Sequence, residues 1–451
     1  MKNFMNKAAF PIFAGLLISG SLFSNSTASA QQGNSRELDD LRERLARLEA
    51  AQSQPSPEAE EITKMQMQSQ LPDPLGAGFT GLGPAASKIY SSRLPIAIGA
   101  VGDISFQSVS SGTNSVSVTN ADLLFGARVS KRLIFNSAVS LDDAPGVMAK
   151  GSRIHYAYMD LLFGDEAGVR VGNFLIPFGV TNLRFEPTLY PMVNRPAVDR
   201  LVIPTDWNED GLLGFYRGPN WSFQAGLMNA GDISTASAGT WLRDGRQAGV
   251  SAKAESLAWV VRAETNSRML PSGRPWPALG VSIYGGSWAQ GDKSRFGNAD
   301  VLMGEIHAGF SWWRFKAEAL YAAGRLSDND KISGTLARGI SSRTQGSTVS
   351  VAFDLLAPNK QRAANILTAP AGEESPFYHE LPIFISYEHA DAQADLPNAF
   401  TAERESYASI WTFGVNYLPH EQFVLKGDFA VRHDRNGFES RAIETALGFT
   451  F

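Results

Sequence analysis

Cysteine is absent from all 451 residues of this chain. Small exported proteins without a large hydrophobic core usually depend on disulfides, so this chain must gain its stability in another way. A strong positive charge is also missing, because 40 basic residues stand against 45 acidic ones and the formal net charge is -5 at pH 7. Nucleic-acid binders usually carry a concentrated basic face, and the composition therefore predicts no nucleic-acid partner.

Recognisable catalytic and metal-binding motifs are missing as well. No G-x-S-x-G or H-E-x-x-H pattern occurs, and no glycine loop with a following lysine could cradle a phosphate. The histidines are scattered over the chain: His155, His307, His379, His389, His420 and His433. We therefore expect no cofactor, no metal site and no enzymatic activity.

The N-terminus carries the one long apolar run. Lys2 and Lys7 precede the run from Ala8 to Phe23, and an A-x-A cleavage site follows at residues 28–30. A transmembrane anchor would need about 20 apolar residues and no cleavage site, so residues 1–30 are interpreted as a signal peptide.

Two short segments follow the predicted cleavage site. In residues 31–54, leucines 38, 41, 45 and 48 are spaced 3, 4 and 3 apart, which predicts a short coiled coil of about two heptads rather than a lone amphipathic helix. Residues 55–93 are interrupted by prolines and glycines and are interpreted as a linker.

Residues 94–451 show runs of about ten residues in which apolar and polar side chains alternate. In residues 423–433, Phe423, Leu425 and Phe429 share one face, and charged side chains occupy the other. Either a soluble sandwich or a membrane barrel could use such strands. Sandwich strands average five or six residues and tilted membrane strands about 9 to 11, so the run lengths favour an all-β transmembrane barrel.

The connectors between these runs support the barrel. Short turns at 130–131, 164–168, 218–220, 311–312 and 419–420 alternate with longer segments, among which we place 357–380. The count is seventeen strands if residues 249–255 form one of their own, and sixteen if they belong to the preceding loop. Bacterial barrels normally have an even number, so we predict a 16-stranded antiparallel barrel preceded by the short coiled-coil helix.

The last strand explains an aromatic C-terminus. In residues 441–451, Ile443, Leu447, Phe449 and Phe451 share the face that we assign to lipid. We expect this strand to pair with the first one near Leu94 and close the sheet, because an open edge is not tolerated in hydrocarbon. A terminal Phe also resembles the signal by which outer-membrane barrels are recognised for assembly.

One stretch resembles a known family. Residues 172–179, GNFLIPFG, follow a strand–turn–strand pattern that is similar to one in the porin O and porin P family of bacterial outer-membrane channels, and the likeness extends from the signal peptide through the barrel. The resemblance implies a homotrimer in the outer-membrane lipid of a Gram-negative bacterium. It also implies that the third long loop folds into the pore as a constriction, and that some relatives select phosphate.

Residues 177–210 correspond to that loop. The segment contains five prolines and is long for a structureless surface loop, so the sequence independently favours inward folding. The charged residues that we assign to the constriction carry both signs: Arg184, Arg195, Asp199, Arg200, Asp206 and Glu209.

Strand alternation also predicts which charged side chains face the water. The pore-lining candidates are Arg132, Arg170, Arg262, Arg314, Lys316, Lys426, Asp428 and Arg432. Each could equally pair with a neighbour and only stiffen the wall. His155 and His389 fall on the predicted lipid side. We expect a porin for passive diffusion of small hydrophilic solutes and ions, with small anions such as phosphate as the leading class by resemblance; an adhesive, structural or enzymatic barrel is the alternative.

Overall fold

The computed structural model describes residues 43–44, 75–76, 78–92, 94–110, 112–141, 153–204, 206–249, 251–265, 279–356 and 380–451. The predicted signal peptide lies outside these residues, and so does the predicted coiled coil apart from the helical pair Glu43 and Arg44. None of the helices in these ranges has the length and apolar content of a membrane span.

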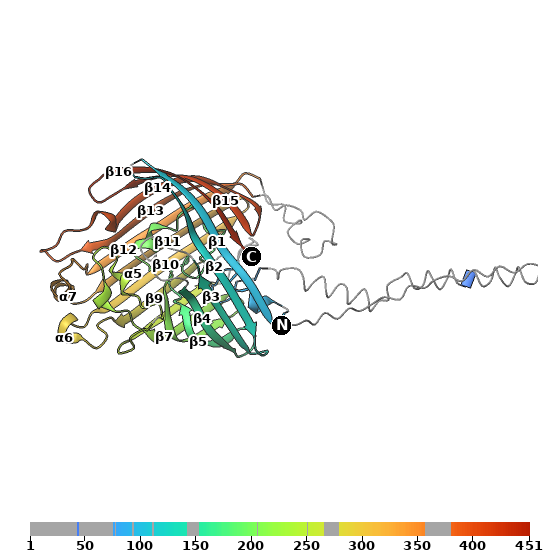
Figure 1. Ribbon diagram of the computed structural model, residues 1–451, viewed down its shortest axis with the longest axis horizontal. Coiled ribbons are helices and arrows are strands. Elements are labelled where there is room, and N and C mark those ends of the chain that lie inside the picture. The colour runs from blue at the N-terminus through green and yellow to red at the C-terminus, as the bar shows by residue number, and fades with distance from the viewer. Residues whose placement is uncertain are drawn as a thin grey trace, which may run out of the picture. The chain divides into compact units, whose positions relative to one another are not determined.

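Sixteen antiparallel strands form a closed barrel, as predicted (Figure 1). Each strand pairs with its neighbours in sequence, and β1 pairs with β16. The strands are β1 Ile96–Val109, β2 Ser115–Arg128, β3 Leu133–Ser140, β4 Arg153–Leu162, β5 Ala167–Leu175, β6 Asn208–Arg217, β7 Trp221–Asn229, β8 Leu257–Thr265, β9 Leu279–Ser287, β10 Asp300–Trp312, β11 Phe315–Leu326, β12 Arg343–Asp354, β13 Pro382–Asp395, β14 Tyr407–His420, β15 Phe423–His433 and β16 Glu439–Thr450.

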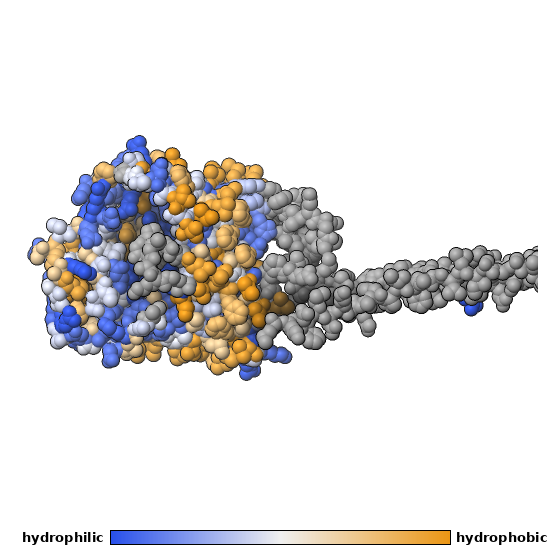
Figure 2. All heavy atoms as spheres, viewed as in Figure 1, coloured by the Kyte–Doolittle hydropathy of each residue, from blue (hydrophilic) through white to orange (hydrophobic). Residues whose placement is uncertain are grey.

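The outer surface is apolar because of the period-2 alternation. On β10, Leu302, Ile306 and Phe310 are more than half exposed, whereas Glu305 and His307 between them point inward and are buried. Figure 2 shows the resulting apolar band on the face of the barrel in view. Five exposed tryptophans lie near strand ends, where aromatic residues of membrane barrels meet the lipid–water interfaces: Trp221, Trp259, Trp312, Trp313 and Trp411.

The two ends of the barrel differ in their connectors. The loop end carries η1 Ile233–Thr235, α5 Trp241–Gly245, α6 Lys293–Phe296, α7 Asn329–Leu336 and η3 Arg404–Ser406 (Figure 1). Residues 249 and 251–255 lie before β8 and outside any strand, which confirms their assignment to the loop. The placement of 357–380 among the long loops is wrong, because β12 ends and β13 begins at the turn end, together with the C-terminus.

The closure between β1 and β16 is confirmed. Val101 pairs with Thr450, and the register continues to Val109 opposite Ala442. Beyond the strand, the N–H of Phe451 donates to the carbonyl of Ala100 (2.9 Å), and the N–H of Ala100 donates back (2.9 Å). The terminal residue is therefore bonded into the wall.

Part of the predicted linker is folded. Residues 78–92, which we call the lumenal segment, contain α3 (Lys88–Ser91) and pack inside the barrel rather than outside it. Leu82, Ala86 and Ile89 are almost fully buried. Two glycines in and next to this segment allow close packing, because a Cβ at Gly76 would collide with the backbone of Ser87 and a Cβ at Gly83 with the carboxylate of Glu186.

Candidate functional site in the barrel lumen

The loop from residue 176 to residue 207, between β5 and β6, fills the middle of the lumen. Residue 205 apart, it is described throughout, and almost every residue is buried. Its one helix is α4 (Ala197–Leu201), which begins after Pro196 and packs on β12 and β13. A surface loop would leave its backbone in water, so this burial shows that the loop folds inward, as predicted.

The far wall of the barrel holds the tip of the loop. Lys426 Nζ donates to the carbonyls of Tyr190 (2.9 Å) and Met192 (2.8 Å), and lies 3.9 Å from the Tyr190 ring centroid. The N–H of Val193 donates to Asp428 (2.8 Å). Further contacts from β14, β16 and β13 join Asn416 to Pro191, Glu444 to Asn194 and Glu388 to the N–H of Ala197.

A charged cluster holds the other end of the loop. Asp206, in a left-handed conformation with φ 53°, accepts from Arg195 (2.7 Å) and Arg153 (2.8 Å). His155 Nε2 lies 3.3 Å from Asp206 Oδ1, and His155 Nδ1 lies 3.4 Å from Asp122 Oδ2. The loop is therefore tied to the β2 and β4 wall by ion pairs.

The assignment of His155 to the lipid side is wrong. Tyr156 pairs with Ala138 and Ile154 with Val139, so His155 is an extra residue in the β3–β4 ladder. Such a β-bulge shifts the alternation by one residue. As a result, His155 and Tyr156 both point inward and are buried, whereas His389 faces outward beside Tyr407 as expected.

Burial perturbs the carboxyl groups of the loop. Burial raises the pKa of Glu186 to about 7, although the backbone N–H groups of Ala86 and Ala85 oppose the shift. The pKa of Asp199 is raised to about 7 in the same way, mainly by burial. For Asp206 burial also acts upward, but Arg195 and His155 outweigh it and hold the pKa well below its ordinary value.

Two of the predicted pore-lining arginines are locked into the wall. Arg170 forms an ion pair with Asp160 (2.8 Å) and covers the ring of Tyr158 at 3.8 Å. Arg262 bonds to Glu264 (2.7 Å) and donates to the carbonyl of Gly179 in the loop (2.7 Å). Both arginines point inward and are buried, so they support the loop and the lumenal segment.

Other predicted positions are distributed differently. Arg132 and Arg314 belong to turns rather than to inward strand faces, because β3 begins at Leu133 and β11 at Phe315. Arg314 lies over the outward ring of Phe353 (5.0 Å), so the assignment of these two arginines to the pore wall is corrected. Glu209 lies at the start of β6 and accepts from Asn229 (2.5 Å) and from the N–H of Gln247 (2.9 Å) in the next loop.

Cavities remain above and below the tip of the loop. The outer cavity, at the loop end, consists of two adjoining hollows that share Arg200, Arg432 and Ser440. Its basic residues are Arg200, Arg243, Arg404 and Arg432, and its acidic residues are Glu388, Glu403, Glu405, Asp428, Asp434 and Glu444. Asp434 is paired with Arg404.

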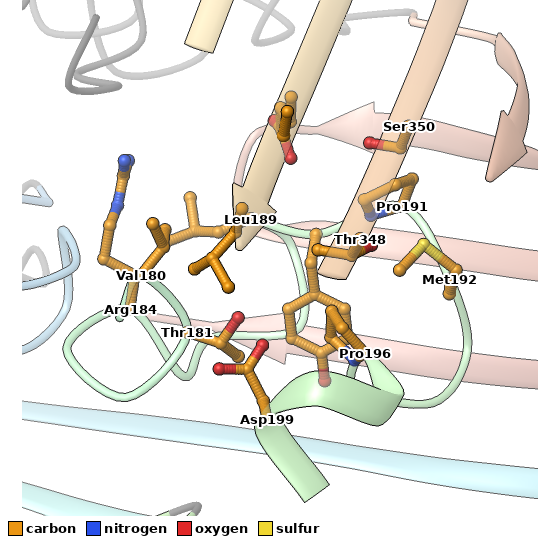
Figure 3. Close-up of a pocket in the computed structure, with 14 residues that line it drawn as sticks. Val180, Thr181, Arg184, Leu189, Pro191, Met192, Pro196, Asp199, Thr348 and Ser350 are labelled. Carbon is orange, nitrogen blue, oxygen red and sulfur yellow. The ribbon is translucent and has the colours of Figure 1, made fainter. Parts of the chain in front are cut away.

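The inner cavity consists of two hollows that share Arg184, Leu189, Tyr190, Pro191, Glu318 and Ser350. Figure 3 shows the loop residues Val180, Leu189 and Met192 and the β12 residues Thr348 and Ser350 around one of them. The predicted residue Lys316 lines the second hollow, 3.9 Å from Glu380.

The tip of the loop separates the two cavities. Along β15 the inner cavity reaches Val424, and the outer cavity begins at Asp428. Lys426 lies between them and bonds to the carbonyls of the tip. A solute moving along this side of the lumen must therefore pass residues 190–194.

The sequence interpretation misses several residues of this arrangement. Asp122, Asn136 and Tyr158 are polar residues on inward strand faces, and alternation alone identifies them as facing the lumen. His155 depends on a bulge, which the sequence does not mark. Tyr90 lies in the lumenal segment, where the only signal is a cluster of apolar and aromatic residues within a proline-rich stretch.

Comparison with known proteins gives no match to a family model. An uncharacterized protein of Aquifex aeolicus (strain VF5) is 28% identical over 373 residues, which cover 79% of this chain and 80% of that protein. The porin O and porin P resemblance therefore stays an expectation.

Several solved outer-membrane proteins have a similar outline. OmpF of Salmonella typhi in complex with daunomycin has a TM-score of 0.48 at 10% identity and covers 79% of this chain and 97% of that one. The outer-membrane channel DcaP of Acinetobacter baumannii gives 0.46 at 10% identity, with 80% and 99% covered. The trimer form of OmpT from Vibrio cholerae gives 0.44 at 10% identity, with 79% and 99% covered. These similarities are too weak to transfer a function, and the fold rests on the strand pairing of this chain.

The closed sheet and its apolar band settle the location. Among membrane-spanning structures, closed barrels of antiparallel strands satisfy every backbone hydrogen bond without a sheet edge. Barrels of this kind, with an even strand number and an apolar outer belt, belong to the outer membrane of Gram-negative bacteria. This chain is such an outer-membrane barrel.

Proposed function

We propose that this chain is a porin, a channel for passive diffusion of small hydrophilic solutes and ions, in which loop 176–207 forms the constriction. The observation that carries this proposal is a sixteen-stranded barrel whose lumen is lined with charged side chains and crossed by an anchored loop. A passage of this kind needs polar walls, with the charges near the constriction biasing which sign of ion enters. A homotrimer is part of the proposal.

The arginines of the outer cavity are the ground for an anion preference. Four arginines and six acidic residues line its two hollows. Glu388, Asp428 and Glu444 each accept a hydrogen bond from the constriction loop, and Asp434 is paired with Arg404. Arg200 and Arg432 line both of its hollows, immediately outside the tip of the loop. We therefore propose a preference for small anions, phosphate included, that is set at this outer side.

Planar-bilayer recording tests the channel. Purified protein should give stepwise conductance increases in groups of three, as a trimer of pores requires. Protein that migrates as a folded barrel on an unheated gel and yet gives no steps would refute the channel and leave an adhesive or structural barrel.

The reversal potential across a salt gradient tests the preference for anions. Arg200→Gln should lower the ratio of anion to cation permeability, whereas Arg295→Gln, which alters an exposed arginine on α6, should not. A cation-selective wild-type channel that phosphate does not block would contradict the anion preference, and the channel itself would stand.

A further inference from the structure

The lumenal segment occupies one side of the barrel interior, at the turn end. Arg128 near the end of β2 donates to the carbonyl of Ile89 (2.7 Å), and Gln224 of β7 donates to the carbonyl of Thr80 (3.0 Å). Tyr90 donates to Asp160 of β4 (2.6 Å). The segment therefore contacts the wall from β2 to β7.

The same segment also contacts the constriction loop. One oxygen of Glu186 accepts from the N–H of Ala85 (2.8 Å) and of Ala86 (3.3 Å). The N–H of Gly83 donates to the carbonyl of Leu183 (3.2 Å). Gly83 has no room for a side chain, because a Cβ there would lie 1.9 Å from the second oxygen of Glu186.

The barrel wall behind the lumenal segment is lined with polar and charged side chains, as in a water-filled lumen. Asn136, Tyr158 and Gln224 face the segment, and the Asp160–Arg170 ion pair lies beside Tyr90. In a permanently dry interior a buried ion pair is often no better than apolar residues of similar volume, so such a wall is not explained by packing alone. In a water-filled lumen, by contrast, polar inward residues are the rule.

These contacts carry an inference that rests on the proposed channel function. We propose that residues 78–92 are a displaceable plug: in place, they close the β2–β7 side of the lumen and hold loop 176–207, and when they move, a second passage opens along the polar wall. The segment satisfies the wall residues with its backbone carbonyls, which water could replace. The second passage is thus filled by residues 78–92 of the same chain.

Deletion of residues 78–92 gives the direct test. The passage left behind should be roughly as wide as one chain segment with its side chains, about 10 Å, so single-channel conductance should rise at least about twofold. A deletion variant that conducts like the wild type would overturn the plug. Because the variant could fail to assemble, two point substitutions provide the same test in the full chain.

Steric substitutions displace the segment from either side. Gly83→Ala places a methyl group against Glu186, and Gly126→Ala places one 2.4 Å from the Cβ of Ile89. Both should raise the conductance or add a second, larger conductance level. Gly427→Ala is the matched control, because no atom lies within 4 Å of the added Cβ. Equal conductance in all three variants would count against a displaceable segment.

A disulfide provides a reversible test of whether residues 78–92 can be displaced, since the chain has no native cysteine that could interfere. In the double variant I89C with G126C, the Cβ atoms start closer than the ~3.8 Å of a disulfide, so a small shift allows the bond to form. The oxidised channel should keep the low conductance, and reduction should raise it. The same low conductance in both states would refute displacement.

Cysteine labelling separates this inference from the channel itself. In Asn136→Cys, the thiol lies behind the segment and should react slowly with a water-soluble maleimide. Adding Gly83→Ala should speed the reaction at least tenfold, and adding Gly427→Ala should not. If the protein does not conduct but shows this labelling pattern, the porin proposal is refuted and the plug proposal stands. If it conducts normally but labelling is equally fast with Gly83→Ala and with Gly427→Ala, the plug proposal is refuted and the porin proposal stands.

Discussion

Removing the amine of Lys426 should release the tip of the constriction loop. Lys426→Met keeps a side chain of similar length but loses two hydrogen bonds to the carbonyls of Tyr190 and Met192 and the contact with the Tyr190 ring. Hydrogen bonds from charged donors contribute about 1.5–3 kcal/mol each, and a cation over an aromatic ring about 0.5–2 kcal/mol.

The two hydrogen bonds alone, at the low end of their range, contribute about 3 kcal/mol, which sets the scale of the effect. Since every 1.4 kcal/mol is a factor of ten, loss of the anchor should raise the population with a displaced tip about 100-fold. Residues 190–194 lie between the outer and inner cavities, so their displacement widens the passage. Single-channel traces should show frequent excursions to a higher conductance.

Arg441→Met is the control for this variant. It also removes one positive charge, but Arg441 is exposed and its side chain pairs with Glu439 on the same strand. Both variants should remain folded barrels on unheated gels. Traces of Lys426→Met that match those of the wild type and of Arg441→Met would refute the anchoring role.

Two further outcomes follow from the closure of the barrel and from the buried carboxyl groups. Deleting Phe451 removes its two hydrogen bonds to Ala100 and should lower the yield of assembled barrel, measured by heat-modifiable migration on gels. The channels that do form should keep nearly the same ion selectivity. A normal yield with altered selectivity would contradict this. The pKa of Glu186 is raised from 4.5 to about 7, so the folded state binds a proton that the unfolded state releases, and stability is fully present below pH 4.5 and falls as pH rises through 7. Over the whole shift, the free energy of unfolding falls by about 3 kcal/mol. In Glu186→Gln the urea midpoint should therefore depend less on pH between 5 and 8. A variant whose urea midpoint falls as steeply with pH as that of the wild type would assign the effect to other groups.

Strand alternation predicted most of the wall, because lipid on one side and water on the other impose a period of two. The face of Lys426 and Asp428 followed from this rule, and so did the outward row that ends at Phe451. The rule fails where the backbone departs from regular pairing. Because His155 is an extra residue in its strand, its side chain points into the lumen instead of toward lipid. Arg132 and Arg314 lie in turns rather than on inward strand faces.

The interior was harder to predict because its contacts join residues that are far apart in sequence. Length and prolines indicated that loop 176–207 folds inward, but its attachment to Lys426 spans more than 230 residues. The lumenal segment contains no helical or strand periodicity, so the pattern of glycine and proline resembled that of a linker. Its position depends on shape complementarity, such as the fit of Gly83 against Glu186, which no local pattern contains.

The loop also joins opposite sides of the barrel. It leaves the wall at β5, returns at β6, and bonds to β14, β15 and β16; β6 and β14 are eight places apart in a ring of sixteen. A closed sheet resists stretching along its hydrogen bonds but can flatten into an oval. The loop acts as a cross-brace against that flattening, so lateral pressure from the membrane and movement of the constriction are mechanically coupled.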